Sequence, residues 1–427
     1  MINVILTILL YFSSILTSLW LLLQSIYYQK AKKQKTDDPI LNSEEKRIDI
    51  IVAIKDENEE VIKNLVENLS ELDYKNYKVI IVSDDNEEYF TKIVRYLGNI
   101  PNNFILIRRP SNEGRKAGAL NFALNMSNAE MVAFLDADAR VDKDFLKKLS
   151  SLNYDAVAFR IKIRDAVTYI QRAYKYTTEF TMDSLFKARY NLGFLIFPNG
   201  SAFAIKRDLL TKLGGWKYGK ITEDLELGLR LALNGIKIHY VNSVIVYSLA
   251  PYDLQDLYNQ IRRWAYGSAE LLLYSMRLFK LGTKGIEGFI YTQQWGIYPS
   301  YLFFLMLALS LQFIIRINFI YILGSLMPVI LSTIIYNIML RAKGDYRAGI
   351  ITIIASMFGY IQGLFRMKFN WKVTPKKKLN SEENEVTSIK ILGLFLALLS
   401  YVNALFDSIL SSLILLALAI SFLLLQS

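Results

Sequence analysis

The chain has 427 residues, of which 53% are hydrophobic, and its formal net charge is +11. So high a hydrophobic content excludes an intrinsically disordered protein. The chain has no cysteine and one histidine, which excludes disulfide frameworks, cysteine nucleophiles, thiolate metal sites and multi-histidine zinc sites. Any chemistry must therefore depend mainly on carboxylates, lysine, arginine and oxygen ligands.

The N-terminal residues 2–28 carry no charge, and this run is longer than the roughly 20 residues that cross a bilayer. Lysines follow it directly, at positions 30, 32, 33 and 35. The positive-inside rule then places the N-terminus outside and the following chain in the cytosol. A cleaved signal peptide fits poorly, because no basic residue precedes the apolar run and no small-residue cleavage site ends it. We predict that residues 1–28 form an uncleaved transmembrane helix.

Residues 46–290 read as strands that alternate with helices. Apolar runs predict strands at 47–54, 78–82, 104–107 and 131–135, and helical patterns lie between them, as at 58–72 and 117–126. This alternation predicts an α/β domain with a mostly parallel sheet covered on both faces. Ligands of such sheets bind beyond the carboxyl ends of the strands.

Acidic residues follow three of these strands, beginning with Asp56 and Glu57 after the strand at 47–54. Asp84 and Asp85 come after the strand at 78–82, and Asp136 and Asp138 come after the strand at 131–135. A single acidic loop after a strand is common and is weak evidence of function. Several carboxylates at one sheet edge repel one another, however, and a divalent cation or a polar ligand would offset that repulsion.

Two later segments also carry candidate site residues. Thr222, Glu223 and Asp224 begin a helix, where a threonine cap and acidic residues are also expected for purely structural reasons. The helix predicted at 253–274 places Gln260, Arg263 and Trp264 on one face. Such a face could hold a sugar ring and a diphosphate, although an amphipathic helix on a membrane surface would look the same.

The C-terminal residues 291–427 are again rich in apolar runs. Four of these runs are long enough to span a membrane, at 297–315, 317–340, 389–405 and 408–426. Residues 348–365 are apolar but flanked by basic residues on both sides, which favours an interfacial or re-entrant helix. With the N-terminal helix we expect five spans, or six if 348–365 also cross.

The order of these motifs resembles that of the membrane-embedded family 2 glycosyltransferases, which include the cellulose, hyaluronan and poly-N-acetylglucosamine synthases. The resemblance covers about residues 48–275. It is carried by an ordered set of short segments, namely Asp84–Asp85, 112–121, Asp136–Asp138, 199–202, 222–224 and 260–264. It implies a GT-A-like fold for the cytosolic domain at 46–290.

The resemblance also implies a role for each matching residue. Asp224, with Glu223 beside it, would be catalytic and would act as the general base. Asp138 and Asp136 would hold Mg²⁺ or Mn²⁺. The residues implied to bind the nucleotide-sugar are Asp84, Asp85, Lys116, Asp136, Gln260, Arg263 and Trp264.

The segment at 366–378 resembles the gating loop of cellulose synthases, and it implies donor contacts for Trp371, Thr374 and Lys376. Two departures from the family pattern stand out. Residues 54–58 replace the usual Pro-x-Tyr-Asn-Glu, so that Asp56 and Glu57 are only weak candidates, and Ser248 stands where many members have glutamate.

The function that the resemblance implies is inverting transfer of a sugar from a UDP-sugar to a growing polysaccharide, with β-linkages, by a plasma-membrane enzyme. One alternative is a single transfer to a lipid such as ceramide, diacylglycerol or a polyprenyl phosphate. A non-enzymatic membrane scaffold is a further alternative, which the intact motifs disfavour. Membrane lipids are expected partners. Nucleic acid is not, because the basic excess lies beside the membrane.

Overall fold

A computed structural model of the chain describes residues 2–33, 45–341, 343–369 and 386–425. An eight-stranded sheet with the order β3-β2-β1-β4-β7-β6-β8-β5 forms the centre of the domain predicted at 46–290. Its strands are β1 (Ile48–Ile54), β2 (Tyr77–Ser83), β3 (Phe104–Arg108), β4 (Met131–Leu135), β5 (Arg140–Val141), β6 (Ala156–Ile163), β7 (Phe203–Lys206) and β8 (His239–Ser248).

The sheet confirms the predicted α/β class and is mixed in direction. Strands β3, β2, β1 and β4 are parallel, as are β6 and β8, whereas β7 runs antiparallel to β4 and β6, and β5 runs antiparallel to β8. A short buried strand such as β7 has the same apolar pattern in either direction, so the sequence does not reveal its orientation. The parallel strands β1, β2 and β4 end at one edge of the sheet, as predicted.

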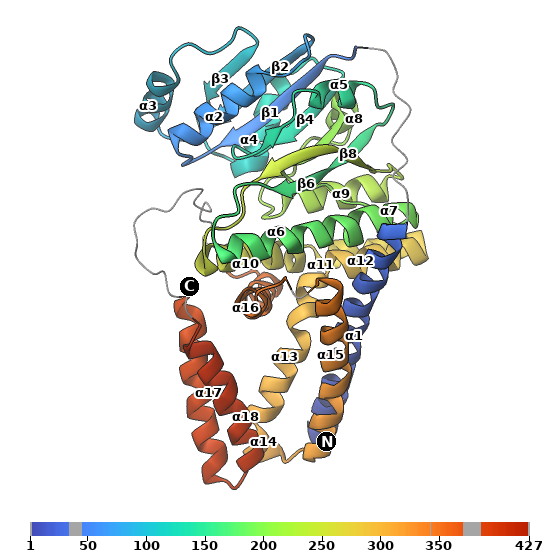
Figure 1. Cartoon of the computed structure of the whole chain (residues 1–427), viewed down its shortest axis with the longest axis vertical. Coiled ribbons are helices and arrows are strands. Elements are labelled where there is room, and N and C mark those ends of the chain that lie inside the picture. Colours follow the sequence, from blue (N-terminus) through green and yellow to red (C-terminus); the bar gives the residue numbers. More distant parts are fainter. Residues whose placement is uncertain (1, 34–44, 342, 370–385, 426–427) are drawn as a thin grey trace.

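Helices cover both faces of the sheet (Figure 1). Those of this domain are α2 (Glu59–Ser70), α3 (Glu87–Leu97), α4 (Arg115–Met126), α5 (Phe145–Ser150), α6 (Tyr169–Thr181), the π-helix η1 (Met182–Ala188), α7 (Arg189–Asn191), α8 (Arg207–Lys212), α9 (Glu223–Leu233), α10 (Leu254–Glu270), α11 (Leu272–Ser275), the 3₁₀ helix η2 (Met276–Leu281) and α12 (Thr283–Thr292).

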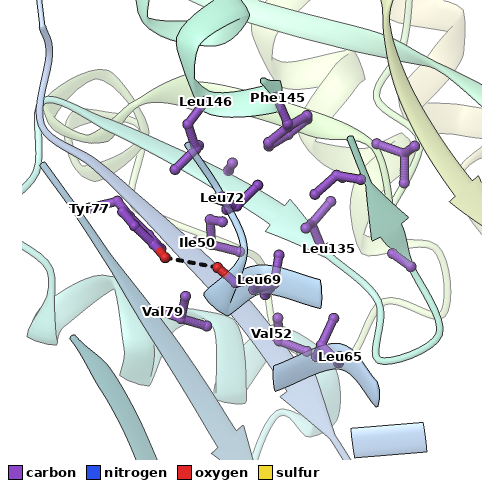
Figure 2. Packing of buried hydrophobic residues seen from close by; sticks show 14 of the residues in the cluster. Ile50, Val52, Leu65, Leu69, Leu72, Tyr77, Val79, Leu135, Phe145 and Leu146 are labelled. Carbon is purple, nitrogen blue, oxygen red and sulfur yellow. Dashed lines mark hydrogen bonds between the residues drawn. The ribbon is translucent and has the colours of Figure 1, made fainter. Parts of the chain in front are cut away.

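Burial on both faces explains why β1 reads as a continuous apolar run. Ile50 and Val52 point to the face covered by α2, where they pack against Leu65 and Leu69 (Figure 2), while Ile51 belongs to the cluster on the opposite face. The Tyr77 hydroxyl donates a 2.8 Å hydrogen bond to the Leu69 carbonyl and so joins β2 to the end of α2. Hydrophobic clusters on both faces of the sheet therefore fix the position of its strands.

The remaining helices form the apolar part of the molecule. They are α1 (Ile2–Lys33), α13 (Gln294–Ser310), α14 (Gln312–Ile315), α15 (Phe319–Met339), α16 (Tyr346–Leu364), α17 (Thr387–Leu405) and α18 (Ile409–Leu423). Helix α1 packs along α13 and α15, and α17 packs against α18. Within the described ranges, the helices long and apolar enough to cross a membrane are four, namely α1, α15, α16 and α17.

The expected five or six spans are therefore not confirmed. The run predicted at 297–315 is divided between α13 and α14, and α18 is a shorter helix of 15 residues. Helix α16 qualifies by length and composition, yet Figure 1 shows it nearly end-on beneath α10, while α1, α13 and α15 run along the long axis. This crossing direction agrees with the interfacial helix predicted for 348–365.

Candidate active site

A cavity of about 2040 Å³ begins at the carboxyl edge of the sheet and continues between the apolar helices. Most of the predicted site residues line it, namely Asp84, Lys116, Asp136, Asp138, Glu223, Asp224, Gln260, Arg263 and Trp264. Asp85 does not line this cavity. The predicted gating residues Trp371, Thr374 and Lys376 lie outside the described residues.

Lys116 joins the two acidic motifs. It lies in the first turn of α4, and its Nζ donates to Asp136 Oδ1 at 2.8 Å and lies 3.5 Å from Glu223 Oε1. Burial alone would lower the pKa of Lys116, but the carboxylates of Asp136, Glu223 and Asp224 raise it above its usual value. Lys116 therefore stays positively charged between the strand end and α9.

Asp224 lies in the first turn of α9 with its Oδ1 accepting a 2.8 Å hydrogen bond from the Leu225 amide. Burial and the neighbouring Glu223 carboxylate raise the pKa of Asp224 to about 6. A carboxylate with this pKa is ionised at neutral pH and remains basic enough to accept a proton during a reaction.

The loop before β7 approaches these groups closely. A Cβ at Gly200 would lie 3.1 Å from Asp224 Oδ2 and 3.5 Å from Lys116 Nζ. A side chain at this position would require a neighbouring group to shift by a few tenths of an ångström, so glycine lets the backbone of the Asn199–Ala202 segment lie close to Asp224 and Lys116.

The two acidic residues after β2, Asp84 and Asp85, make different contacts. Arg109, at the end of β3, donates to both carboxylate oxygens of Asp84 at 2.6 Å and to the Glu113 and Arg115 carbonyls. Asp85 accepts from the Ser83 hydroxyl and from the Asp56 amide, so it holds the loop after β1. Of the two carboxylates, Asp84 is the one that lines the cavity.

Helix α10 brings Gln260, Arg263 and Trp264 to the cavity together. The Trp264 ring lies 5.6 Å from the Trp295 ring of α13, centroid to centroid. The aromatic face predicted for α10 is therefore paired with a second indole from an apolar helix, next to the sheet edge.

Several buried polar atoms around the cavity have no hydrogen-bond partner among the described residues. They are Asn199 Nδ2, Thr222 Oγ1, Ser248 Oγ and Gln260 Oε1. Thr222 occupies the N-cap of α9 but makes no side-chain cap bond, so helix capping alone does not explain it. Because buried polar groups normally find partners, these atoms indicate that the cavity receives a polar ligand.

The residues at the end of β4 fit a divalent cation. Within the described ranges no group of three or more His, Asp or Glu side chains has an arrangement that could hold a metal ion by itself, but Asp136 and Asp138 both line the cavity. Mg²⁺ is commonly held by one or two carboxylates together with substrate phosphates and water. This donor set thus suits a cation that arrives with a diphosphate.

Two contributors were not predicted as site residues. Arg109 orients Asp84, and its signal was a basic residue after the third strand, opposite an acidic edge. In the sequence, Gly200 is one position of the 199–202 motif, and nothing there indicates that its missing side chain makes room for Asp224 and Lys116.

Comparison with known families gives two matches. The model described as "Glycosyltransferase like family 2" matches residues 47–267, and the model described as "Cellulose synthase" matches residues 204–344.

Curated relatives extend the comparison. The chain is 29% identical to a "Probable glycosyltransferase" of Sulfolobus acidocaldarius over 88% of either chain. It is 30% identical to a beta-monoglucosyldiacylglycerol synthase of Trichormus variabilis over 53% of this chain and 50% of that one. It is 26% identical to a poly-beta-1,6-N-acetyl-D-glucosamine synthase of Staphylococcus aureus over 61% of this chain and 65% of that one.

Among solved structures, the mannosyltransferase PcManGT from Pyrobaculum calidifontis, in complex with GDP-Man and Mn²⁺, shares the fold. Its TM-score is 0.59 at 20% identity, and the match covers 84% of this chain and all of that one. The likeness shows that the two chains have the same architecture.

Proposed function

The chain belongs to glycosyltransferase family 2, and from this we propose that it is a membrane-integrated, inverting and metal-dependent sugar transferase with Asp224 as its base. The observation that carries the proposal is the position of Asp224. Its carboxylate has a pKa of about 6 and lines the same cavity as Lys116, Asp136 and Asp138.

In the proposed reaction an acceptor hydroxyl attacks the anomeric carbon while Asp224 takes its proton. Because a single displacement inverts the anomeric centre, an α-linked donor would give a β-linked product. Gln260, Arg263 and Trp264 would bind the donor diphosphate and the acceptor sugar, and Lys116 would bind the diphosphate after release from its contact with Asp136.

Asp138 and Asp136 would hold Mg²⁺ or Mn²⁺, which supplies positive charge for the departing nucleoside diphosphate. PcManGT is in complex with Mn²⁺ and GDP-Man. The UDP-sugar predicted here should therefore be tested beside GDP-mannose. Asp84 and Asp85 are proposed to form the nucleoside side of the site, with Arg109 fixing the orientation of Asp84.

We further propose the division into an N-terminal helix at 1–28, a cytosolic domain at 46–290 and an apolar region at 291–427. In a plasma membrane the N-terminus would lie outside, because lysines follow the first apolar run. The exposed apolar side chains of α15 and α17, such as Ile334 and Leu394, support contact with lipid.

The acceptor was predicted to be a growing polysaccharide, with a lipid as the alternative. The match to the cellulose synthase model and the name of the Staphylococcus relative favour the first. The name of the Trichormus relative favours the second.

The test is a donor panel with the purified full chain in detergent, using UDP-glucose, UDP-N-acetylglucosamine and GDP-mannose with a membrane lipid extract. We expect nucleoside diphosphate release with one donor, loss of release in chelator, and recovery with Mg²⁺ or Mn²⁺. Asp224→Asn should abolish transfer and leave donor affinity within about a few-fold, since the base acts on the acceptor proton. Turnover near wild type in this variant would exclude Asp224 as the base.

A further inference from the structure

Below the sheet edge the cavity continues as a groove between α6, α15 and α16. Its walls are one face of α6 (Tyr174, Thr177, Thr178 and Thr181), one face of α15 (Leu326, Val329, Thr333, Tyr336 and Asn337) and the start of α16. Residues on each face recur at spacings of three and four, as expected for helices that line a common space. Leu326 lies fourteen positions before Leu340, another lining residue, so the groove follows α15 for about 21 Å at 1.5 Å per residue.

The groove is closed at its far end. Beyond Leu326 the helices α1, α13 and α15 meet, where the Ser14 hydroxyl donates to the Ser325 carbonyl at 2.5 Å and the hydroxyls of Tyr301 and Ser325 lie 3.0 Å apart. Leu10, Leu309 and Ile322 are completely buried in the next layer. In the described part of the chain no residue of α14, α17 or α18 lines the cavity. Among the described residues, the groove thus ends within this packing and does not continue as a path for a polymer across the apolar region.

The groove opens sideways between α15 and α16. Thr333 and Asn337 on α15, and Tyr346 and Gly349 on α16, line the cavity and are also exposed. Helix α15 packs on α1 rather than on α16. The apolar residues beside this opening on α15, such as Ile334 and Ile338, are themselves 51% and 61% exposed. The opening therefore faces the surface that α15 would present to lipid tails.

The chemistry of the groove is neutral. Its polar side chains on α6, α13 and α15 are hydroxyls and amides, and these helices contribute no lysine, arginine or carboxylate to the lining. The acidic residue at its rim, Asp345, is paired with Arg347 at 3.1 Å. The cations that line the cavity beside Asp224, such as Lys116 and Arg263, are those proposed to bind the donor diphosphate, and Lys343 at the rim lies over the Tyr176 ring. The walls of the groove itself match an apolar chain and neutral hydroxyl groups, and they offer a lipid phosphate no cationic partner of its own.

We propose that the acceptor is a neutral membrane lipid with a free hydroxyl, whose apolar chain enters between α15 and α16 and whose head reaches Asp224. This inference rests on the proposed glycosyltransferase function. The lipid hydroxyl oxygen forms the bond to the anomeric carbon as the bond to the diphosphate oxygen breaks. The nucleoside diphosphate leaves with that electron pair, and Asp224 takes the hydroxyl proton.

The experiment supplies the full chain in detergent with labelled donor and one of three acceptors: dioleoylglycerol or its dialkyl ether counterpart, undecaprenyl phosphate, or a soluble oligosaccharide. We expect labelled sugar in a glycolipid that partitions into the organic phase, and only when a neutral lipid is the acceptor. Transfer to undecaprenyl phosphate, or to a soluble or polymeric product, would overturn the inference. So would the absence of transfer to any acceptor by a chain that binds the donor, whereas failure to bind any donor would contradict the proposed function itself.

Two adjacent positions supply a matched pair of variants. Thr333 lines the cavity while Ile334 points away from it, and both are exposed on α15. Thr333→Trp should reduce kcat/KM for the lipid by about ten-fold or more with donor affinity retained, and Ile334→Trp should change it less than about two-fold. Gly349→Leu provides a second obstruction, because a Cβ there meets no atom within 4 Å. Equal rates in all three variants would rule out entry by this opening.

Discussion

The raised pKa of Asp224 predicts how activity depends on pH. Because burial and Glu223 raise this pKa to about 6, the carboxylate loses its negative charge as the pH falls through 6. If Asp224 is the base, kcat/KM should be constant above pH 7 and should fall about ten-fold per unit below pH 6. A pH profile at saturating metal concentration measures this directly. Asp155→Asn, at an exposed carboxylate paired with Lys206, is the control and should leave the profile unchanged.

Gly200 provides a second prediction for a single residue. An alanine methyl group would lie 3.1 Å from Asp224 Oδ2, which is too close unless the loop or the carboxylate moves by a few tenths of an ångström. Because small displacements of catalytic groups can cost up to about 100-fold, Gly200→Ala should lower kcat markedly with a nearly unchanged melting temperature. A normal kcat would show that transfer tolerates a displacement of Asp224.

Several candidate site residues could be placed from the sequence because they lie at the end of a strand or at the start of a helix. A strand followed by Asp136 and Asp138, or a helix that begins with Glu223 and Asp224, is visible in sequence. The contacts between them were not predictable. Lys116 contacts both Asp136 and Glu223, and Arg109 contacts both Asp84 and the loop at 113–115. These partners lie on different elements, so the periodicity of a helix or strand does not predict that they meet.

At the scale of elements, α16 is tied to the helix that carries Gln260, Arg263 and Trp264. A Cβ at Gly359 would lie 2.2 Å from the Arg262 carbonyl oxygen and 3.0 Å from the Ala265 Cβ. Gly359→Ala should therefore push α16 away from α10 and weaken donor binding, and Gly359→Leu should do so more strongly. Titration of the nucleotide against both variants measures the effect, and equal affinities in wild type and both variants would contradict it.

The direction of α16 also marks where sequence reasoning was useful and where it failed. The flanking basic residues favoured an interfacial or re-entrant helix at 348–365, and this stays a prediction: α16 is long and apolar enough to span, and in Figure 1 it crosses the direction of its apolar neighbours. The run at 297–315 was read as one span, but the helix is interrupted at Leu311 between α13 and α14. Hydropathy reports composition along the chain and is insensitive to such breaks.

At the scale of the whole molecule, the N-terminal helix contacts a buried ion pair that lies within the domain at 46–290. Arg189 of α7 is fully buried, and its guanidinium donates to both oxygens of Glu287 on α12 at 2.7 and 2.8 Å. The Tyr27 hydroxyl of α1 donates to the same carboxylate at 3.4 Å. The guanidinium also lies over the Tyr291 ring, which stacks on Phe197 beside the loop that holds Gly200.

This arrangement predicts a large cost when one member of the pair is removed. Glu287→Ala leaves the Arg189 charge buried without its partner, a change that costs about 3–5 kcal/mol in other proteins. Glu71→Ala is the matched control, because Glu71 pairs with Lys143 at 3.2 Å where both side chains are more than half exposed, and such pairs contribute about 0–1 kcal/mol. Thermal unfolding of the full chain in detergent should show a much lower midpoint for Glu287→Ala than for Glu71→Ala. Because the Arg189 guanidinium lies over Tyr291, which stacks on Phe197, turnover below the midpoint should fall as well. Equal midpoints for the two variants would show that the buried pair contributes no more to stability than an exposed one.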